Sequence, residues 1–178
     1  MPFEFKKTEI EGVLLVETRK FDDRRGFFVE LFKENQMKGI PNFVQGNMSF
    51  SVAGVIRGLH YQINPFPQGK LVTVANGRIL DVAVDIRRSS PTFGKFVKAE
   101  LTPGRMLWIP PGFAHGFQAM EDSVVIYFIT HSTYSPQHER CINWNDEEIG
   151  IDWPLKNWIL SDKDALCPKL SSAEINFI

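Results

Sequence analysis

The segment KLVTVANGRILDVAVDI, residues 70–86, constrains the fold more than any other part of the chain. Two runs rich in β-branched residues flank Asn76-Gly77, a pair suited to the positive φ angles of a type I′ turn. Turns rich in Pro, Gly and Ser separate the short strand-like runs that follow, and this punctuation is typical of a sandwich or barrel. The sequence therefore predicts an all-β fold. The further runs are residues 95–101, 105–109 and 123–129.

A two-residue hairpin at this turn predicts which side chains share a face. It places Val72 opposite Asp81 and Lys70 opposite Ala83. Lys70, Asp81 and Asp85 are then expected to point the same way. The other face is apolar and is expected to pack between two sheets. It carries Leu71, Thr73, Leu80, Val82 and Val84.

The length and charge of the chain limit its organisation and its partners. The 178 residues fit a single domain, residues 1–178, with helix expected only near residues 31–38 and in a short C-terminal piece. A net charge of -1 gives no general attraction for nucleic acid or for an anionic membrane surface. No signal peptide and no membrane-length apolar run is recognisable, so a soluble protein in the cytoplasm is expected.

Cys141 and Cys167 are the two cysteines of the chain. They show neither a CxxC pattern nor the Cys/His spacing of a zinc site. The prediction from sequence is therefore two ordinary thiols, without a disulfide framework or a structural metal.

One motif points to a particular sandwich. GRMLWIPPGFAHGF places Gly104, Pro110, Gly112 and His115 in the spacing G-x5-P-x-G-x2-H. This resembles the second cupin motif, whose Pro and Gly turn a strand so that the His faces the interior. The resemblance implies a cupin-type double-stranded β-helix, or jelly roll.

The first cupin motif, G-x5-H-x-H-x3,4-E, is matched only in part. GVIRGLHYQINPF supplies Gly54 and His60, but Gln62 stands where the second His belongs, and Pro65 or Phe66 where the Glu belongs. A first-row metal needs about three or four suitable protein donors. The sequence therefore predicts no metal and no other cofactor, and leaves a metal-dependent cupin as a minor alternative.

Collinear blocks narrow the resemblance to one family. From Gly12 to Asp164 the chain resembles the dTDP-4-dehydrorhamnose 3,5-epimerase family, which is metal-independent. Membership implies epimerisation at C3 and C5 of dTDP-4-dehydro-6-deoxy-D-glucose; a 3-epimerase or 5-epimerase of a related sugar is the main alternative. The blocks include RGFFVELF, QGNMSFSVAGVIRGLHYQ, QGKLVTVANGRILDVAVDIR, YSPQHE, WNDEEIGIDWP and LSDKD.

The chemistry of epimerisation next to a ketone assigns three roles. A base removes a proton, a donor meets the enolate oxygen, and an acid returns a proton to the opposite face. His60 is the candidate base, because imidazole is suited to proton transfer near neutral pH. Lys70 is the candidate for the enolate oxygen. The resemblance implies that Asp164 orients the base and that Tyr134 is the acid.

Two further side chains are expected beside this group. The resemblance pairs His115 with Asp81 as a supporting dyad. Arg57 is out of phase with His60 on a regular strand, but a bulge at Gly58 would bring both into one cavity, where the guanidinium would suit the diphosphate or sugar.

The remaining candidates concern the nucleotide and assembly. The resemblance implies that Arg25, Phe27 and Glu30 bind the nucleotide base, often across the subunits of a homodimer with exchanged N-terminal strands; Arg24 competes with Arg25 for this role. A sugar-nucleotide binding protein without activity is the remaining alternative, but binding alone needs no acid and base on opposed faces. For the dTDP-4-keto-6-deoxy sugar substrate, Gln45 and Asn47 are candidates to bind the sugar or phosphate, and Phe27 or Trp144 is a candidate to stack on the thymine.

Overall fold

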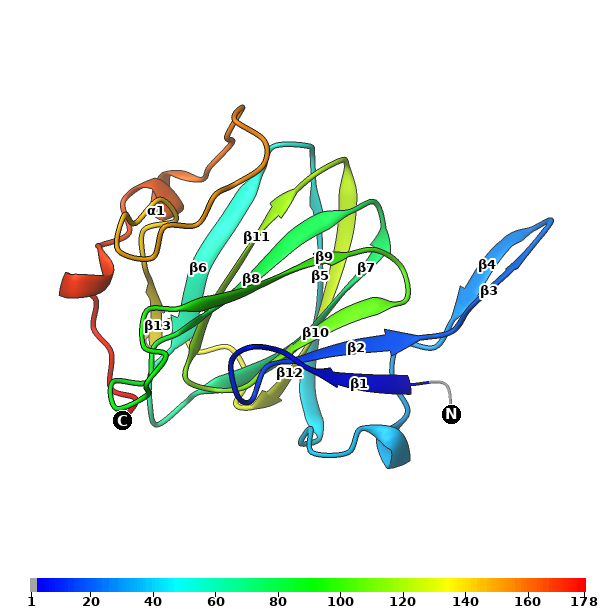
Figure 1. Cartoon of the computed structure of the whole chain (residues 1–178), viewed down its shortest axis with the longest axis horizontal. Coiled ribbons are helices and arrows are strands. Elements are labelled where there is room, and N and C mark those ends of the chain that lie inside the picture. Colours follow the sequence, from blue (N-terminus) through cyan, green and yellow to red (C-terminus); the bar gives the residue numbers. More distant parts are fainter. Residues whose placement is uncertain (1–2) are drawn as a thin grey trace.

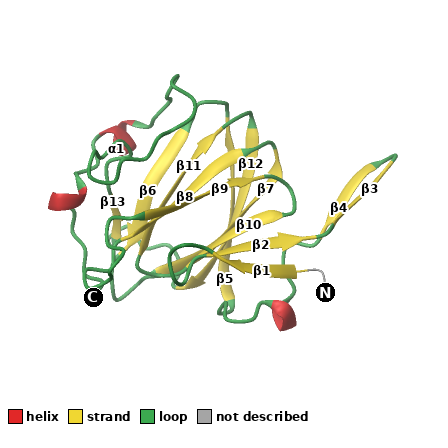
Figure 2. Cartoon of the chain, in the orientation of Figure 1, coloured by secondary structure: helices red, strands yellow, loops and turns green. Residues whose placement is uncertain are grey.

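The computed structural model describes residues 3–178, and within them two antiparallel sheets form a β-sandwich (Figures 1 and 2). This confirms the prediction of an all-β, cupin-type sandwich. The first sheet has six strands in the order β1 (Phe3–Lys7), β2 (Leu14–Thr18), β10 (Arg105–Ile109), β7 (Gln68–Asn76), β12 (Ser123–His131) and β5 (Phe43–Ser51). The second has five, in the order β13 (Glu139–Cys141), β6 (Ile56–Gln62), β11 (Phe113–Ala119), β8 (Ile79–Asp85) and β9 (Phe96–Leu101).

Helical structure is confined to short pieces at the periphery, as predicted (Figure 2). They are the 3₁₀ turn η1 (Glu34–Gln36), the one-turn helix α1 (Asp162–Ala165) and the 3₁₀ turn η2 (Leu170–Ser172). Among residues 3–178 there is no helix long and apolar enough to cross a membrane.

The predicted hairpin at Asn76-Gly77 is wrong in its pairing. Gly77 does adopt a positive φ of 88°, but β7 pairs with β10 and β12, whereas β8 pairs with β9 and β11. The turn therefore carries the chain from one sheet to the other. All of β8 is buried or partly buried, and in β7 only Asn76 is exposed, so neither strand has the solvated face that a surface hairpin would leave.

The change of sheet also reverses the predicted faces. Val72 and Ala83, from the face assigned to Lys70, belong to the apolar cluster between the sheets. Leu71 and Val82, predicted to lie between the sheets, instead belong to two clusters that coat the outer faces. Lys70 therefore points into the space between the sheets.

The cysteines do not remain thiols. Cys141, on β13, and Cys167, just after α1, form a disulfide. They are 26 residues apart in sequence, so spacing gave no sign of the pairing.

Two surface features leave apolar groups uncovered. The hairpin of β3 (Lys20–Asp23) and β4 (Gly26–Val29) extends away from the sandwich (Figure 1). Its Phe28 is 64% exposed. The edge strand β5 also turns a row of apolar side chains outward, with Met48 73% exposed and Phe50 58% exposed.

Candidate active site

Two adjoining cavities lie between the sheets and share their central residues. The smaller has a volume of about 270 Å³ and the larger about 520 Å³. His60, on β6 of the five-stranded sheet, faces both cavities, as do Lys70 on β7 and Tyr127 on β12 of the six-stranded sheet. The structure therefore brings His60 and Lys70 together as predicted, with each sheet supplying one wall.

His60 forms a close dyad with Asp164. His60 Nε2 lies 2.6 Å from Asp164 Oδ1, and the backbone N–H of Gly58 donates to Asp164 Oδ2 at 3.3 Å. Burial alone would raise the pKa of Asp164, but the hydrogen bond from His60 and the donors around it outweigh burial and lower that pKa. The carboxylate therefore stays ionised and can hold the imidazole in one orientation.

The predicted bulge beside His60 is present. His115 opposes His60 but Phe117 opposes Arg57, so β6 has one more residue than β11 between these pairs. Gly58 adopts a φ of 135° within it, and a Cβ there would lie 2.5 Å from the Cα of Gly116. Only glycine fits this backbone. The result is that Arg57 and His60 line the same cavity.

A second dyad lies next to the first. His115 Nε2 is 2.7 Å from Asp81 Oδ1, and both side chains are buried. Burial lowers the pKa of His115 and raises that of Asp81, although each partner partly offsets the shift of the other. His115 is therefore neutral at neutral pH, and its edge reaches the smaller cavity.

Lys70 supplies a positive charge at the centre of the site, where both cavities meet. Loss of hydration lowers its pKa to about 8, despite the opposing effect of Asp81 and Glu139. At pH 7 the ammonium is still charged. Because the pKa is close to neutral, this proton is held more loosely than on a surface lysine.

Glu139 and Lys163, which sequence reasoning missed, complete the wall. Glu139, on β13, lines both cavities and accepts hydrogen bonds from Lys163 and from the Tyr134 hydroxyl, the latter at 2.9 Å. Burial would raise the pKa of Glu139, but these donors outweigh it and lower that pKa. The YSPQHE block includes Glu139, so the family blocks contained a signal that was not used.

Two tyrosines lie at the larger cavity, and only Tyr134 was predicted. Tyr134 belongs to the loop between β12 and β13, is 52% exposed, and donates a hydrogen bond from its hydroxyl to Glu139. Tyr127 was missed, because it sits inside the run SVVIYFI, which reads as a core strand. It is half-buried and packs against the inter-sheet cluster, and burial raises its pKa.

The predicted sugar contacts are brought to the larger cavity. Gln45 and Asn47 alternate onto the inner face of β5 and both line it. Gln45 Nε2 donates to Asn47 Oδ1 at 2.9 Å, and Gln45 Oε1 accepts from the backbone of Tyr134 at 2.8 Å.

The predicted nucleotide contacts lie elsewhere in this protomer. Arg25 and Phe27 are on the projecting hairpin, and Glu30 follows β4; none of them lines the two central cavities. Arg25 is paired with Asp23 through a contact of 2.6 Å.

Two expectations fail here. Trp144, a candidate for stacking on the base, is buried against Trp153 in the outer core of the five-stranded sheet, and its ring contacts Trp158. Asp85, expected to accompany Lys70, instead accepts hydrogen bonds from Arg87, Ser90 and Thr92 in the following loop. The sequence placed Asp85 by a hairpin register that does not exist.

The donors in the cavity do not fit a metal. Among residues 3–178 no three His, Cys, Asp or Glu side chains are grouped to hold an ion. Gln62, at the position of the second cupin His, uses its amide to bond Phe66, Thr133 and Ser135. His60 and His115 each direct Nε2 to a carboxylate instead.

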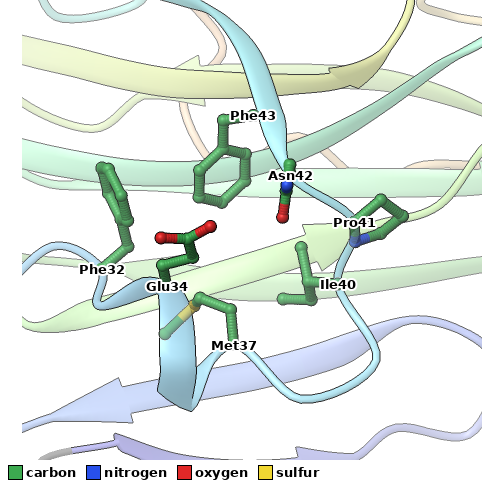
Figure 3. Close-up of a pocket in the computed structure, with 7 residues that line it drawn as sticks. All are labelled: Phe32, Glu34, Met37, Ile40, Pro41, Asn42 and Phe43. Atoms are coloured by element: carbon green, nitrogen blue, oxygen red, sulfur yellow. The ribbon is translucent and has the colours of Figure 1, made fainter.

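A third pocket, of about 250 Å³, lies apart from this chemistry (Figure 3). It surrounds η1 and the start of β5, and its walls are mostly apolar, with the single carboxylate of Glu34. It contains no histidine, lysine or tyrosine, so it lacks the His base and the cationic donor found together in the central cavities.

Comparison with known proteins identifies relatives that share one description. A family model described as dTDP-4-dehydrorhamnose 3,5-epimerase matches residues 7–172. The enzyme of that name from Shigella flexneri is 48% identical over 174 residues, covering 94% of this chain and 96% of the relative. The crystal structure of dTDP-4-dehydrorhamnose 3,5-epimerase from Sulfolobus tokodaii is 59% identical, with a TM-score of 0.92 and 100% coverage of both chains. The 3,5-epimerase of Legionella pneumophila, solved with dTDP-4-keto-L-rhamnose, is 42% identical, with a TM-score of 0.90 and coverage of 96% and 94%.

Proposed function

The chain belongs to the dTDP-4-dehydrorhamnose 3,5-epimerase family, and we propose that it inverts C3 and C5 of dTDP-4-dehydro-6-deoxy-D-glucose with His60 as the base. The product is dTDP-4-dehydro-L-rhamnose. The chain is accordingly an isomerase. The observation that carries the assignment of roles is the His60–Asp164 dyad, which faces Lys70 across a cavity.

His60 removes the proton next to the ketone. Asp164 accepts the hydrogen bond from Nε2 and stabilises the imidazolium that forms. The electrons of the C–H bond move to the C4 oxygen, which gives an enolate. Asp164 is ionised in this environment, as its lowered pKa indicates.

Lys70 stabilises the enolate. Its ammonium projects from the opposite sheet and is only partly compensated by Asp81 and Glu139. An ammonium in a poorly hydrated site interacts strongly with a developing oxyanion. The His115–Asp81 dyad supports Lys70, because the Asp81 carboxyl group raises the pKa of the lysine and so opposes the effect of burial.

The acid is a tyrosine, and the two-sheet geometry favours Tyr127 over the Tyr134 predicted from sequence. Tyr127 comes from the six-stranded sheet and His60 from the five-stranded sheet, so a sugar between them meets base and acid on opposite faces. The proton of Tyr134 is instead directed to Glu139. Tyr134 remains the second candidate, because it lines the same cavity.

Substrate binding combines the larger cavity with a second subunit. Arg57 is suited to the diphosphate, and Gln45 and Asn47 to the sugar. We assign Arg25, Phe27 and Glu30 to the nucleotide of a partner's site, because their hairpin projects away from its own cavity (Figure 1). The outward apolar row of β5 gives a homodimer an interface.

Proton NMR in deuterated water tests the reaction. Solvent deuterium is expected at both C3 and C5, with exchange about 10² to 10⁴ times slower in His60→Ala. Tyr127→Phe is expected to block inversion more strongly than Tyr134→Phe, and the reverse order would return the acid role to Tyr134. Exchange at one carbon alone would assign a single-centre epimerase, and no exchange would reject the epimerase assignment.

Analytical ultracentrifugation tests the assembly. A dimer is expected for the wild-type chain, and Met48→Asp, in the exposed row of β5, is expected to shift it toward monomer. A wild-type protein that remains monomeric at micromolar concentration would contradict the shared site.

A further inference from the structure

The helical turn that carries Asp164 has almost no apolar anchor of its own. Between Ser161 and Lys169 only Asp164 and Cys167 are buried, and Leu166 is 83% exposed. A single helical turn is unstable by itself, because forming the first turn fixes several residues for one hydrogen bond. The position of α1 must therefore come from its links to the sandwich.

Backbone hydrogen bonds anchor the segment on either side of α1, from Ile56 N–H to Ile159 O at 2.9 Å and from Asn143 N–H to Pro168 O at 2.7 Å. Within α1 itself the noncovalent links to the sandwich are few. Lys163 forms an ion pair with Glu139, but its side chain is 58% exposed, and exposed pairs contribute little. Gly58 donates a long hydrogen bond of 3.3 Å to Asp164 itself. Ser161 caps the helix, which orders the turn locally but does not attach it to a strand.

The covalent link attaches α1 next to the base. Cys167 follows α1 directly, and its disulfide partner Cys141 is the Cα partner of His60 across β13 and β6. A ring therefore closes through His60, Cys141, the disulfide, Cys167 and Asp164, and returns to His60 through the 2.6 Å dyad contact.

We propose that the Cys141–Cys167 disulfide is a positioning element for catalysis, which keeps Asp164 within hydrogen-bonding reach of His60. This inference rests on the proposed role of the dyad. Neither sulfur touches the substrate; the disulfide acts through α1. Without it the segment is still anchored by backbone hydrogen bonds at Ile159 and Pro168, but between these points only the Lys163 ion pair, the long Gly58 hydrogen bond and the dyad contact itself hold Asp164. The imidazole then loses its fixed orientation for part of the time.

A double-mutant cycle separates positioning from stabilisation of the fold. The four proteins are wild type, Cys141→Ala/Cys167→Ala, Asp164→Asn, and the variant with all three changes. Displacement of a catalytic group by about 1 Å costs up to roughly 10²-fold, so kcat of the double cysteine variant is expected to fall roughly ten- to hundredfold. Adding the cysteine changes to Asp164→Asn is expected to lower kcat no further.

The pH profile gives a second readout. If the disulfide acts through Asp164, the profile of kcat/KM for the cysteine variant is expected to move toward that of Asp164→Asn. Loss of stability alone would leave the profile of the folded enzyme unchanged. Wild-type kcat in the cysteine variant, or a full additional loss in the triple variant, would overturn the proposal. Wild-type kcat in Asp164→Asn would instead overturn the role of the dyad.

Reduction of the wild-type protein covers the case in which the cysteine variant does not fold. The chain has only two cysteines, so dithiothreitol can act on this bond alone: the S–S bond gives two thiols and the reagent becomes its cyclic disulfide. Alkylation and mass spectrometry count the thiols, and circular dichroism reports the folded fraction. A ten- to hundredfold loss in folded, reduced enzyme, reversed on reoxidation, is expected; unchanged kcat with two titrated thiols would reject the inference.

Discussion

Replacement of Lys70 by Met is expected to lower activity without lowering the stability of the fold. The ammonium loses hydration between the sheets, which lowers its pKa from 10.5 to about 8. At pH 7 the lysine is protonated in both the folded and the unfolded chain. Because the folded chain binds this proton more weakly, the charged lysine lowers the free energy of unfolding. A shift of one pKa unit corresponds to about 1.4 kcal/mol, so this cost is at most about 3 kcal/mol.

The attraction of Asp81 and Glu139 is already contained in this pKa, so the figure is the net cost of keeping the ammonium between the sheets. Lys70→Met is therefore expected to unfold with a free energy equal to the wild-type value or up to about 3 kcal/mol above it. Removal of the enolate donor is expected to lower kcat by about 10²- to 10³-fold. The opposite signs of the two effects are the signature of a residue retained for function.

Urea unfolding at pH 7 and the deuterium-exchange assay measure the two effects. Lys98→Met, at an exposed position on β9, is the matched control and is expected to change neither. In wild type, the contribution of Lys70 to the free energy of unfolding should increase between about pH 8 and 10.5, because only the unfolded chain keeps the proton in that range. Activity should fall above about pH 8, where the folded enzyme loses the proton. A destabilised Lys70→Met that keeps wild-type kcat would refute the reasoning.

Three further changes test other parts of the structure. The pKa of Asp85 is lowered to about 2, because the hydrogen-bond donors around it outweigh burial. This carboxylate should therefore contribute about 2 kcal/mol to the free energy of unfolding, and the contribution should be lost as pH falls from about 4 to 2. Urea unfolding should show that this loss is absent in Asp85→Asn. Gly58→Ala places a Cβ 2.5 Å from the Cα of Gly116, at a residue with a positive φ, so thermal unfolding should show a loss of more than about 3 kcal/mol of stability. A smaller loss would show that the backbone at Gly58 can adopt another conformation. Gln62→Leu removes the 2.7 Å acceptor of the Ser135 N–H, and KM is expected to rise as the Tyr134 loop loosens; an unchanged KM would show that Gln62 only fills space.

The sequence predicted the class of fold and the centre of the site because both depend on local or strongly patterned signals. Turn residues and β-branched runs mark strands, and the cupin spacing placed His115 beside His60 on paired strands. The bulge was predicted from the glycine at position 58 and from the phase of Arg57 and His60, which share a cavity only if the strand contains an extra residue.

The predictions that failed concern contacts between residues that are distant in the chain. Asn76-Gly77 specifies a turn but does not specify whether the flanking strands pair, and here each strand pairs with two other strands in a different sheet. Trp144 and Tyr127 exchanged their expected environments, because an aromatic side chain is compatible with both a core and a cavity wall. The contact between Cys141 and Cys167 joins a strand to the segment after α1, which no local pattern encodes.

The split of the site between the two sheets has a consequence for how such enzymes diverge. The distance from His60 to Lys70 is set by how far apart the sheets stand, and that separation depends on apolar side chains such as Val72 and Ala83. A methyl group gained or lost there changes the width of the reaction space without touching a sugar atom. Drift in the packing of the core is therefore a route by which related enzymes acquire different stereochemical outcomes, and core redesign aimed at heat resistance will be constrained by the substrate.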